Sequence, residues 1–232
     1  VEMQEHPEWK NKALIVGQDP RQNGGHGVVA TCNYVARKYG VHSAMAAIQA
    51  VRLVPKELIV FTRPRFDKYR AVSAKIHSFM HDVTDQVESV ALDEAYLDVT
   101  HPKIEQESAV QIALDLQKRI RQEVGLNSSF GVSYNKFLAK MGSEYAKPFG
   151  RTVILPSEVQ NFLAMQKIEK FPGIGPKTQE ELHQMGVYTG ADLQKVEVLT
   201  LIKKFKKMGY ILAQHARGID LRPVVTDSEA NE

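Results

Sequence analysis

Two short β-prone runs meet at a pair of adjacent carboxylates near the middle of the chain. The run 87–92 is largely apolar, and in the run 95–100 apolar residues alternate with polar ones, as in a half-buried strand. Asp93 and Glu94 lie between the two runs. Neighbouring side chains of a regular strand point to opposite faces, so both carboxylates can reach one place only at an irregular turn or strand end. The stretch therefore predicts two strands joined at an acidic turn.

This acidic turn has two chemical interpretations. Paired carboxylates on a rigid sheet edge suit hard divalent cations, whose oxygen ligands must be held against mutual repulsion. A solvated hairpin tip carries the same two residues without any function. We take Asp93 and Glu94 as candidate catalytic and metal-binding residues, because motifs elsewhere in the chain favour the first interpretation.

Composition narrows the class of protein. The chain has 232 residues, 43% of them hydrophobic and 25% charged, which fits an ordinary globular protein with more than one domain. No apolar run approaches membrane-spanning length, and no signal-peptide pattern opens the sequence. The single cysteine, Cys32, excludes an internal disulfide and a Cys-rich zinc site, so we expect a cytoplasmic protein. The net charge of +3 is compatible with a polyanionic partner but does not require one.

The order of the expected elements predicts an α+β protein with an all-helical end. In the first part we expect strands at 12–16, 27–32 and 58–62 and helices at 34–39 and 43–53. From 65 to 155 the pattern predicts helices packed on one face of a mainly antiparallel sheet. After Pro156 every candidate element is a short helix, and Ser157 and Gln160 have the spacing of a capping box. We therefore place a domain boundary near Leu155.

Two groups of side chains have the chemistry to bind phosphate. Tyr34 and Arg37 are three residues apart on one expected helix, and Thr31 lies just before it, so all three can donate to phosphate oxygens. Lys147 precedes Pro148 at an expected helix end, where its ammonium can meet phosphate as a point charge. A plain surface helix and a solvent-exposed lysine would give the same pattern.

The segment Phe-Pro-Gly-Ile-Gly-Pro-Lys-Thr at 171–178 has a helix-hairpin-helix signature, which binds a DNA backbone without reading bases. Its glycines let backbone N–H groups approach an anion, and the following helix adds its positive end. We expect Thr178 and Glu181 to form a capping box for that helix. The candidate DNA-binding residues are Gly173, Gly175, Lys177 and Thr178. The alternative is a bend of purely structural use.

Basic residues also gather after this segment. Residues 198–219 contain no Asp or Glu, and their basic residues are Lys203, Lys204, Lys206, Lys207 and Arg217. A uniformly positive module beside a phosphate-binding turn is what counterion-driven binding of nucleic acid requires. A solvated lysine-rich face remains the other interpretation.

Four motifs together resemble the Y-family translesion DNA polymerases, above all their bacterial DNA polymerase IV branch. The motifs are Ala-Thr-Cys-Asn-Tyr-Val-Ala-Arg-Lys-Tyr-Gly (30–40), Leu-Asp-Glu-Ala-Tyr-Leu-Asp (92–98), Gly-Val-Ser-Tyr-Asn-Lys-Phe-Leu-Ala-Lys (131–140) and Lys-Pro-Phe-Gly (147–150). The resemblance implies a small α/β fingers domain (1–65), a palm without its first strand (66–155) and an all-α thumb with the helix-hairpin-helix (156–221). It also implies an exposed tail (222–232) leading to a little finger domain that the chain lacks.

The resemblance further implies template-directed DNA synthesis past damaged bases, in which a primer 3′-hydroxyl attacks the α-phosphate of a dNTP. Two Mg²⁺ ions about 4 Å apart stabilise the attacking and leaving oxygens in such a reaction. Asp93 would be a catalytic metal ligand with Glu94 beside it, while Thr31, Tyr34, Arg37 and Lys147 would contact the triphosphate. The implied partners are primer–template DNA, dNTP and a sliding clamp, the last through segments outside this chain.

In the family, a strand with another catalytic aspartate should precede Val1. We therefore expect a truncated core that binds primer–template DNA weakly and extends it poorly or not at all. A non-catalytic DNA-binding relic of a polymerase would keep the 171–178 turn but have no use for Asp93. A nucleotide-binding phosphotransferase unrelated to DNA is a third interpretation. The polymerase hypothesis requires the acidic turn, Arg37, Lys147 and the 171–178 turn to face one cleft.

Overall fold

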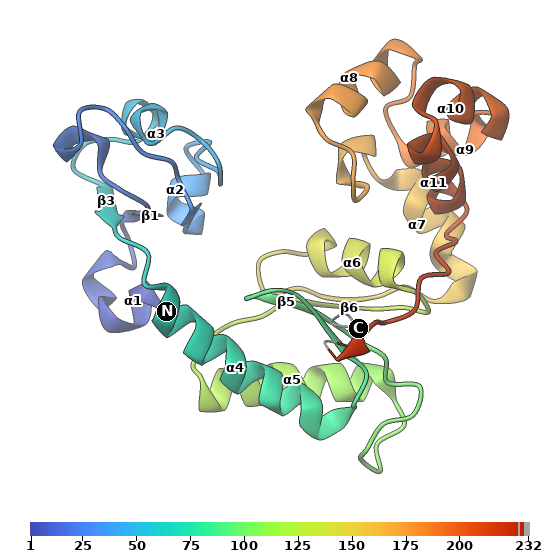
Figure 1. Ribbon diagram of the computed structural model, residues 1–232, viewed down its shortest axis with the longest axis horizontal. Helices are drawn as coiled ribbons and strands as arrows, with labels where there is room; N and C mark the ends of the chain where they lie inside the picture. Colours follow the sequence, from blue (N-terminus) through green and yellow to red (C-terminus); the bar gives the residue numbers. More distant parts are fainter. Residues whose placement is uncertain (227, 230–232) are drawn as a thin grey trace. The chain divides into compact units, whose positions relative to one another are not determined.

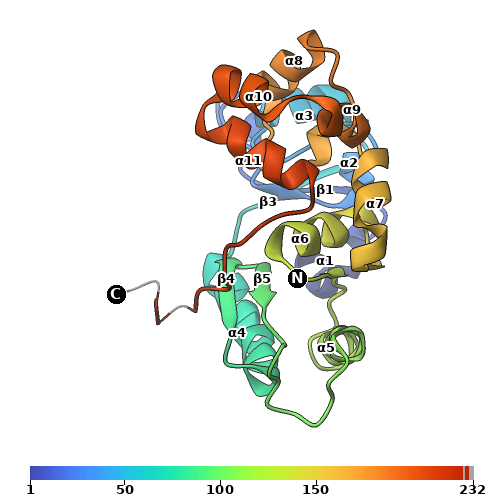
Figure 2. The same ribbon diagram turned by 90° about the vertical axis from the view of Figure 1, so that its right-hand side faces the viewer.

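The computed structural model describes residues 1–226 and 228–229, and the chain forms two compact units, Val1–Ser73 and Ala74–Glu232 (Figures 1 and 2). The boundary falls inside helix α4 (Phe66–Val83), so this helix begins in one unit and ends in the other. Among the described residues, no helix has the length and apolar character needed to cross a membrane.

The first unit is built around a three-stranded sheet with the order β2-β1-β3. Its strands are β1 (Ala13–Val16), β2 (Thr31–Cys32) and β3 (Ile59–Thr62), and its helices before α4 are α1 (Glu2–Glu5), α2 (Tyr34–Arg37) and α3 (Ala47–Leu53), with 3-10 turns η1 (Pro7–Trp9) and η2 (Pro20–Gln22). Strand β1 pairs antiparallel with β2 and parallel with β3. All four β1 residues are buried, as expected for the central strand of a covered sheet.

Local signals set most element ends in this unit. Asn33 caps α2 by accepting a hydrogen bond from the N–H of Ala36, and Gly40 follows with a φ of 85°. The helix expected over 43–53 begins only at Ala47, because Ala44 has a φ of 67° and Ala46 pairs with Val28 in an isolated β-bridge. The same bridge shortens the strand expected over 27–32.

The second unit starts with two separate strand pairs. Strands β4 (Val87–Ala91) and β5 (Glu94–Leu97) are antiparallel, while β6 (Phe130–Val132) and β7 (Arg151–Val153) are parallel. Helix α5 (Ala109–Glu123) precedes β6, and α6 (Lys136–Tyr145) connects β6 to β7. The α+β class is confirmed, but the expected mainly antiparallel sheet is divided into these pairs. The β6–β7 pair is parallel because a helical crossover joins its strands.

The next part, which we call the helical part (156–217), is built of short helices, as the sequence predicts, with one isolated β-bridge between Lys167 and Thr189. Its elements are η3 (Pro156–Glu158), α7 (Val159–Met165), η4 (Ile168–Lys170), α8 (Pro176–Gln184), α9 (Gly190–Lys195), α10 (Val198–Phe205) and α11 (Lys207–Ala216). A bundle of short helices needs tight contacts between backbones. A Cβ atom on Gly190, for example, would lie only 1.7 Å from the carbonyl oxygen of Leu163.

Both capping boxes expected from the sequence are wrong. Ser157 does not cap a helix, because a 3-10 turn begins at Pro156 and α7 starts only after it. Helix α8 begins at Pro176, a favoured first helical residue, so Thr178 lies inside the helix and caps nothing. The capping box of this part is formed by Thr189 and Asp192 at the start of α9.

Helix α6 joins the strands to the helical part. Its buried residues Phe137, Leu138 and Met141 belong to one core with residues of α7, α8, α9, α10 and α11. The Phe137 ring stacks on the buried His215 ring of α11 at a centroid distance of 3.9 Å. On the strand side α6 comes so close to β6 that a Cβ atom on Gly131 would lie 2.1 Å from the carbonyl oxygen of Ala139.

After α11 the chain returns to α6 and β4 through what we call the return segment (218–226). The side-chain amide of Asn135 donates to the carbonyl of Gly218 at 2.8 Å, and Asp220 accepts from the N–H of Phe137 at 3.0 Å. Lys136, which is buried, contacts Glu88 of β4 at 2.7 Å and the carbonyl of Pro223 at 3.0 Å. Gly218 also lies against Val159, at the start of α7.

Gly131→Ala should destabilise the protein, since the added methyl group would overlap the backbone of α6. We expect a loss of about 2–3 kcal/mol in the free energy of unfolding, measured by urea denaturation. Gly175→Ala is the matched control, because no atom lies within 4 Å of its Cβ position. An equal loss in both variants would contradict the close approach of α6.

His215 should make stability depend on pH. Burial lowers the pKa of His215 from 6.5 to about 4, so the unfolded chain binds a proton that the folded one excludes between these values. We therefore expect the free energy of unfolding to fall by about 2 kcal/mol from pH 7 to pH 5 through this residue, at about 1.4 kcal/mol per pKa unit. His215→Phe should remove that share of the pH dependence in urea titrations, and His26→Phe, at an exposed site, should retain it.

Candidate active site

The acidic turn has the geometry that the sequence predicts. Ser89 pairs with Ala95 and Ala91 with Glu94, so the register shifts between them and leaves Leu92 and Asp93 as the connection. Asp93 is exposed, and its carboxylate has no hydrogen bond or ion pair to any other described residue. Glu94 is half-buried. A strand irregularity thus sets two carboxylates side by side with different surroundings.

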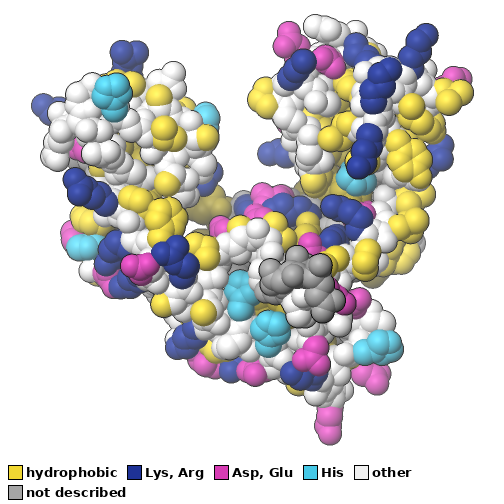
Figure 3. Space-filling view, viewed as in Figure 1, with side chains coloured by type: hydrophobic (Ala, Val, Ile, Leu, Met, Phe, Trp, Pro, Cys, Tyr) yellow, Lys and Arg dark blue, Asp and Glu magenta, His cyan; other side chains and the backbone are white. Residues whose placement is uncertain are grey.

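A row of alternating charges leads from Glu94 on β5 over two residues of α6 to Lys147, just past the end of that helix. The Nζ atom of Lys140 lies 2.6 Å from Glu94 Oε1 and 3.3 Å from Glu144 Oε1, and Lys147 Nζ lies 2.6 Å from the same Glu144 oxygen. We call these four residues the charge row. Acidic and basic side chains lie next to one another in this region of the surface (Figure 3).

The ion pairs keep the middle of the charge row ionised. Burial lowers the pKa of Lys140, but the hydrogen bonds to Glu94 and Glu144 and the charges of these two carboxylates together outweigh it, so the pKa lies above its usual value. Burial raises the pKa of Glu144, yet the hydrogen bond from Lys147 and the charge of Lys140 bring it below its usual value. Both groups therefore carry their charges at neutral pH.

The acidic turn fits Mg²⁺ in the type of its ligands. Mg²⁺ prefers oxygen ligands, and Asp93 and Glu94 supply carboxylates. The number of ligands is smaller than in a complete cage, because the described residues contain no group of three or more acidic, histidine or cysteine side chains that could hold a metal. The acidic turn thus offers two candidate metal ligands, of which only Asp93 has no ion pair to another described residue.

The second set of candidate residues lies in the first unit. Helix α2 places the Arg37 guanidinium 5.8 Å from the centre of the Tyr34 ring, and Arg37 Nε donates to the carbonyl of Cys32 at 3.3 Å. Thr31, Tyr34 and Arg37 are all exposed on neighbouring elements β2 and α2. The structure therefore brings Tyr34 and Arg37 together, and Thr31 precedes them on the adjacent strand β2. Whether they face the acidic turn and Lys147, which belong to the second unit, stays a prediction.

The 171–178 turn is open to an incoming ligand. Gly173 has a φ of 87°, a conformation that favours glycine, and the nearest atom to its Cβ position is the Met208 Cε at 3.8 Å. Gly175 and Lys177 are exposed, and Thr178 is half-buried inside α8. The four lysines at 203, 204, 206 and 207 are also exposed, and basic side chains are prominent on the helical part in Figure 3.

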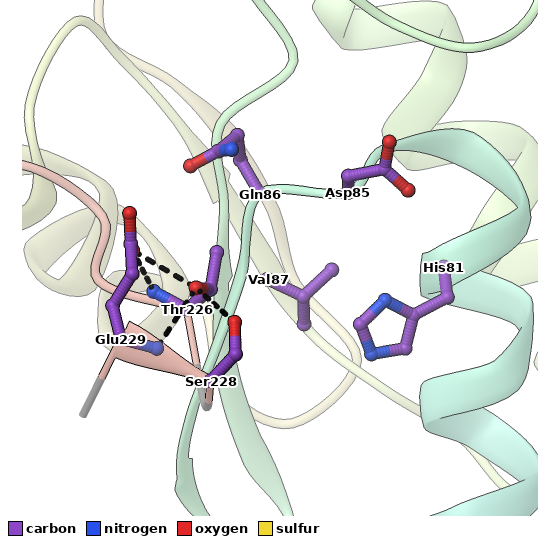
Figure 4. A pocket seen from close by; sticks show the side chains of 7 residues that line it. All are labelled: His81, Asp85, Gln86, Val87, Thr226, Ser228 and Glu229. Atoms are coloured by element: carbon purple, nitrogen blue, oxygen red, sulfur yellow. Dashed lines mark hydrogen bonds between the residues drawn. The ribbon is translucent and has the colours of Figure 1, made fainter. Parts of the chain in front are cut away.

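A cavity of about 480 Å³ lies elsewhere in the second unit (Figure 4). It is lined by His81, Asp85, Gln86, Val87, Thr226, Ser228 and Glu229. None of the residues predicted to bind metal, nucleotide or DNA lines this cavity. The cavity is therefore separate from the candidate active site.

Sequence reasoning missed Lys140 and Glu144. Both belong to helix α6, where their spacing of four residues places them on one face, and Lys147 follows two residues after the last helical residue, Tyr145. The alternation of charge at that spacing was the available signal. What the sequence could not indicate is that the first lysine reaches Glu94 on a strand 46 residues away.

Comparisons with known proteins agree with these features. The impB/mucB/samB family matches residues 1–144, and the IMS family HHH motif matches residues 156–187. DNA polymerase IV of Streptococcus pneumoniae serotype 2 (strain D39) is 51% identical over 97% of this chain and 63% of its own length, and that of Streptococcus gordonii is 50% identical with the same coverage. The chain thus spans less than two thirds of these relatives.

Solved structures give the same result. The crystal structure of DinB from Sulfolobus solfataricus has a TM-score of 0.86 and 32% identity, with 97% of this chain and 65% of that one covered. An insertion ternary complex of Dbh DNA polymerase has a TM-score of 0.84 at the same identity and coverage. By sequence and by fold, the chain belongs to the impB/mucB/samB family of Y-family DNA polymerases.

Proposed function

We propose that this chain is the core of a DNA-directed DNA polymerase that extends a primer along a template, including past damaged bases. The observation that carries the proposal is the exposed carboxylate of Asp93 on a fixed strand connection, at one end of the charge row that leads to Lys147. Metal-assisted transfer of a nucleotide to a primer 3′-hydroxyl needs a carboxylate for the metal and cations for the triphosphate.

Each candidate residue then has a role. Asp93 would hold Mg²⁺, with Glu94 in support, and the metal in a two-ion mechanism would stabilise the attacking and leaving oxygens. Lys147 would bind the triphosphate as a point charge, since its ammonium is partly exposed and its ion pair with Glu144 is partly solvated and therefore weak. Thr31, Tyr34 and Arg37 would donate hydrogen bonds to the same phosphates from the first unit.

The proposed domain boundaries are those that the family resemblance implies. We propose residues 1–65 as fingers, 66–155 as palm, 156–221 as thumb and 222–232 as the tail toward a little finger domain. In the thumb, Gly173, Gly175 and Lys177 would bind the DNA backbone, with Thr178 beside them at the first turn of α8. A sliding clamp is a partner that only the family resemblance supports. The buried free thiol of Cys32 is in keeping with the cytoplasm as the compartment.

Activity of this chain alone should be low. Two carboxylates, one of them paired with Lys140, leave a divalent ion with few protein ligands. A non-catalytic DNA-binding relic is the second candidate, and the pairing of Glu94 with Lys140 is the observation that favours it. The two candidates make different predictions for primer extension once a further carboxylate is added to the chain: the polymerase core should become active, and the relic should stay inactive.

A chain extended before Val1 by the corresponding segment of the pneumococcal relative should extend primers with Mg²⁺, whereas the 232-residue chain should not. Asp93→Asn in the extended chain should lower the rate about a thousandfold, because removal of a metal ligand costs several kcal/mol in the transition state. Single-turnover extension of a labelled primer measures both. Continued inactivity of the extended chain, with DNA binding intact, would favour the relic.

Binding of primer–template DNA should weaken steeply as salt rises. In fluorescence anisotropy titrations, Lys203→Gln/Lys204→Gln should bind more weakly and lower the slope of log Kd against log salt by about 1 for each phosphate that is no longer neutralised. Lys10→Gln/Lys118→Gln removes the same charge from exposed sites outside the helical part and should leave that slope close to its original value. Absence of DNA affinity in the unaltered chain would favour a phosphotransferase unrelated to DNA.

A further inference from the structure

Glu144 holds a position in the charge row that the proposed roles do not use. A single oxygen, Oε1, accepts from Lys147 at 2.6 Å and from Lys140 at 3.3 Å. Lys140 has its shorter contact, 2.6 Å, with Glu94. In the protein without ligands, therefore, the metal-side carboxylate and the phosphate-side lysine are both occupied by internal partners, and Glu144 connects the two pairs.

The contacts of the charge row can be exchanged for one another. All four side chains are between one quarter and one half exposed, so each pair is partly solvated and weak. A lysine side chain is long and flexible, and Lys140 already lies within ion-pair distance of both of its acidic neighbours. It can move fully to Glu144 without leaving the row. The Lys140 ammonium would then neutralise Glu144, and the ion pair between Glu144 and Lys147 would weaken.

We propose that Glu144 is a positioning residue that couples cation binding at the acidic turn to release of Lys147 for phosphate. When Glu94 exchanges the Lys140 ammonium for a divalent cation, Lys140 transfers to Glu144, and Lys147 leaves Glu144 for solvent or for an anion. This exchange breaks the ion pairs Lys140–Glu94 and Lys147–Glu144 and forms the pairs Glu94–cation and Lys140–Glu144, so the Lys147 ammonium is left without a carboxylate partner in the row. This inference rests on the proposed function, because it takes Glu94 as the metal-side and Lys147 as the phosphate-side residue.

The arrangement has a chemical benefit. A lysine paired with a carboxylate has a weaker attraction for phosphate than a free one, so Lys147 would attract the triphosphate most strongly once the cation is in place. The row would thus favour a triphosphate that arrives at a site already holding its metal. The same coupling must act in reverse, because a phosphate that takes Lys147 leaves Glu144 ready to accept Lys140 from Glu94.

The test measures the NMR signals of the two lysines and does not require polymerase activity. Lysine amines of the unaltered 232-residue chain are dimethylated with ¹³C-formaldehyde, which retains their charge, and spectra of Lys140→Arg and Lys147→Arg variants assign the two signals. MgCl₂ is then titrated at constant ionic strength. We expect the signals of Lys140 and Lys147 to shift together, with midpoints that agree within about a factor of two.

The variant Glu144→Gln removes the charge of the shared acceptor with little change of shape. In this variant Lys140 should still respond to Mg²⁺, while the response of Lys147 should disappear. Glu123→Gln, which affects an ion pair with Arg119 on α5, should leave both responses unchanged. Disappearance of both responses in Asp93→Asn/Glu94→Gln would locate the cation at the acidic turn.

The outcomes separate the two proposals. A Lys140 signal that follows Mg²⁺ while the Lys147 signal stays constant would overturn the coupling and leave the metal role of the acidic turn intact. Persistence of the Lys147 response in Glu144→Gln would also overturn it. If neither lysine responds to Mg²⁺, the metal role of Glu94 fails, and the coupling fails with it.

Discussion

The packing of helix α6 is the constraint on which the second unit depends. One side of the helix lies so close to β6 that only glycine fits at residue 131, and Phe137, Leu138 and Met141 extend into the core of the helical part. Its remaining surface carries Lys140 and Glu144 toward the acidic turn. A single ten-residue helix thus fixes the strands, the helical part and the charges of the candidate active site relative to one another.

In the charge row each acidic side chain lies next to a basic one, so charges of the same sign are not grouped together. Of the second-unit side chains expected to bind metal or the triphosphate, Glu94 and Lys147 are ion-paired, and Asp93 is not paired with any other described residue. Pairing avoids the repulsion that two unbalanced lysines or carboxylates would otherwise cause in the protein without ligands. It also means that ligands must replace existing contacts, so affinity depends on the difference between two sets of ion pairs.

Much of this architecture could be predicted from the sequence. Period-2 alternation indicated β5, and the helix expected over 34–39 begins at Tyr34 as predicted, with Asn33 as its cap. The acidic turn and the neighbouring positions of Tyr34 and Arg37 followed from local spacing. The errors came from competition between local signals: Pro156 and Pro176 started helical turns ahead of the expected caps at Ser157 and Thr178. The contacts of Lys140 with Glu94 and of Lys136 with Glu88 join distant segments, so no local pattern could show them.

The return segment brings the two ends of the helical part close together. This part begins at Pro156 and Val159, and the chain leaves it at Gly218, which packs against Val159 and hydrogen-bonds to Asn135. The first and last residues of the helical part therefore lie close together, as do the two ends of a domain that is inserted into another fold. A module of different length or sequence could take its place only if it kept a small residue at 218 and the apolar contacts with Phe137, Leu138 and Met141 of α6.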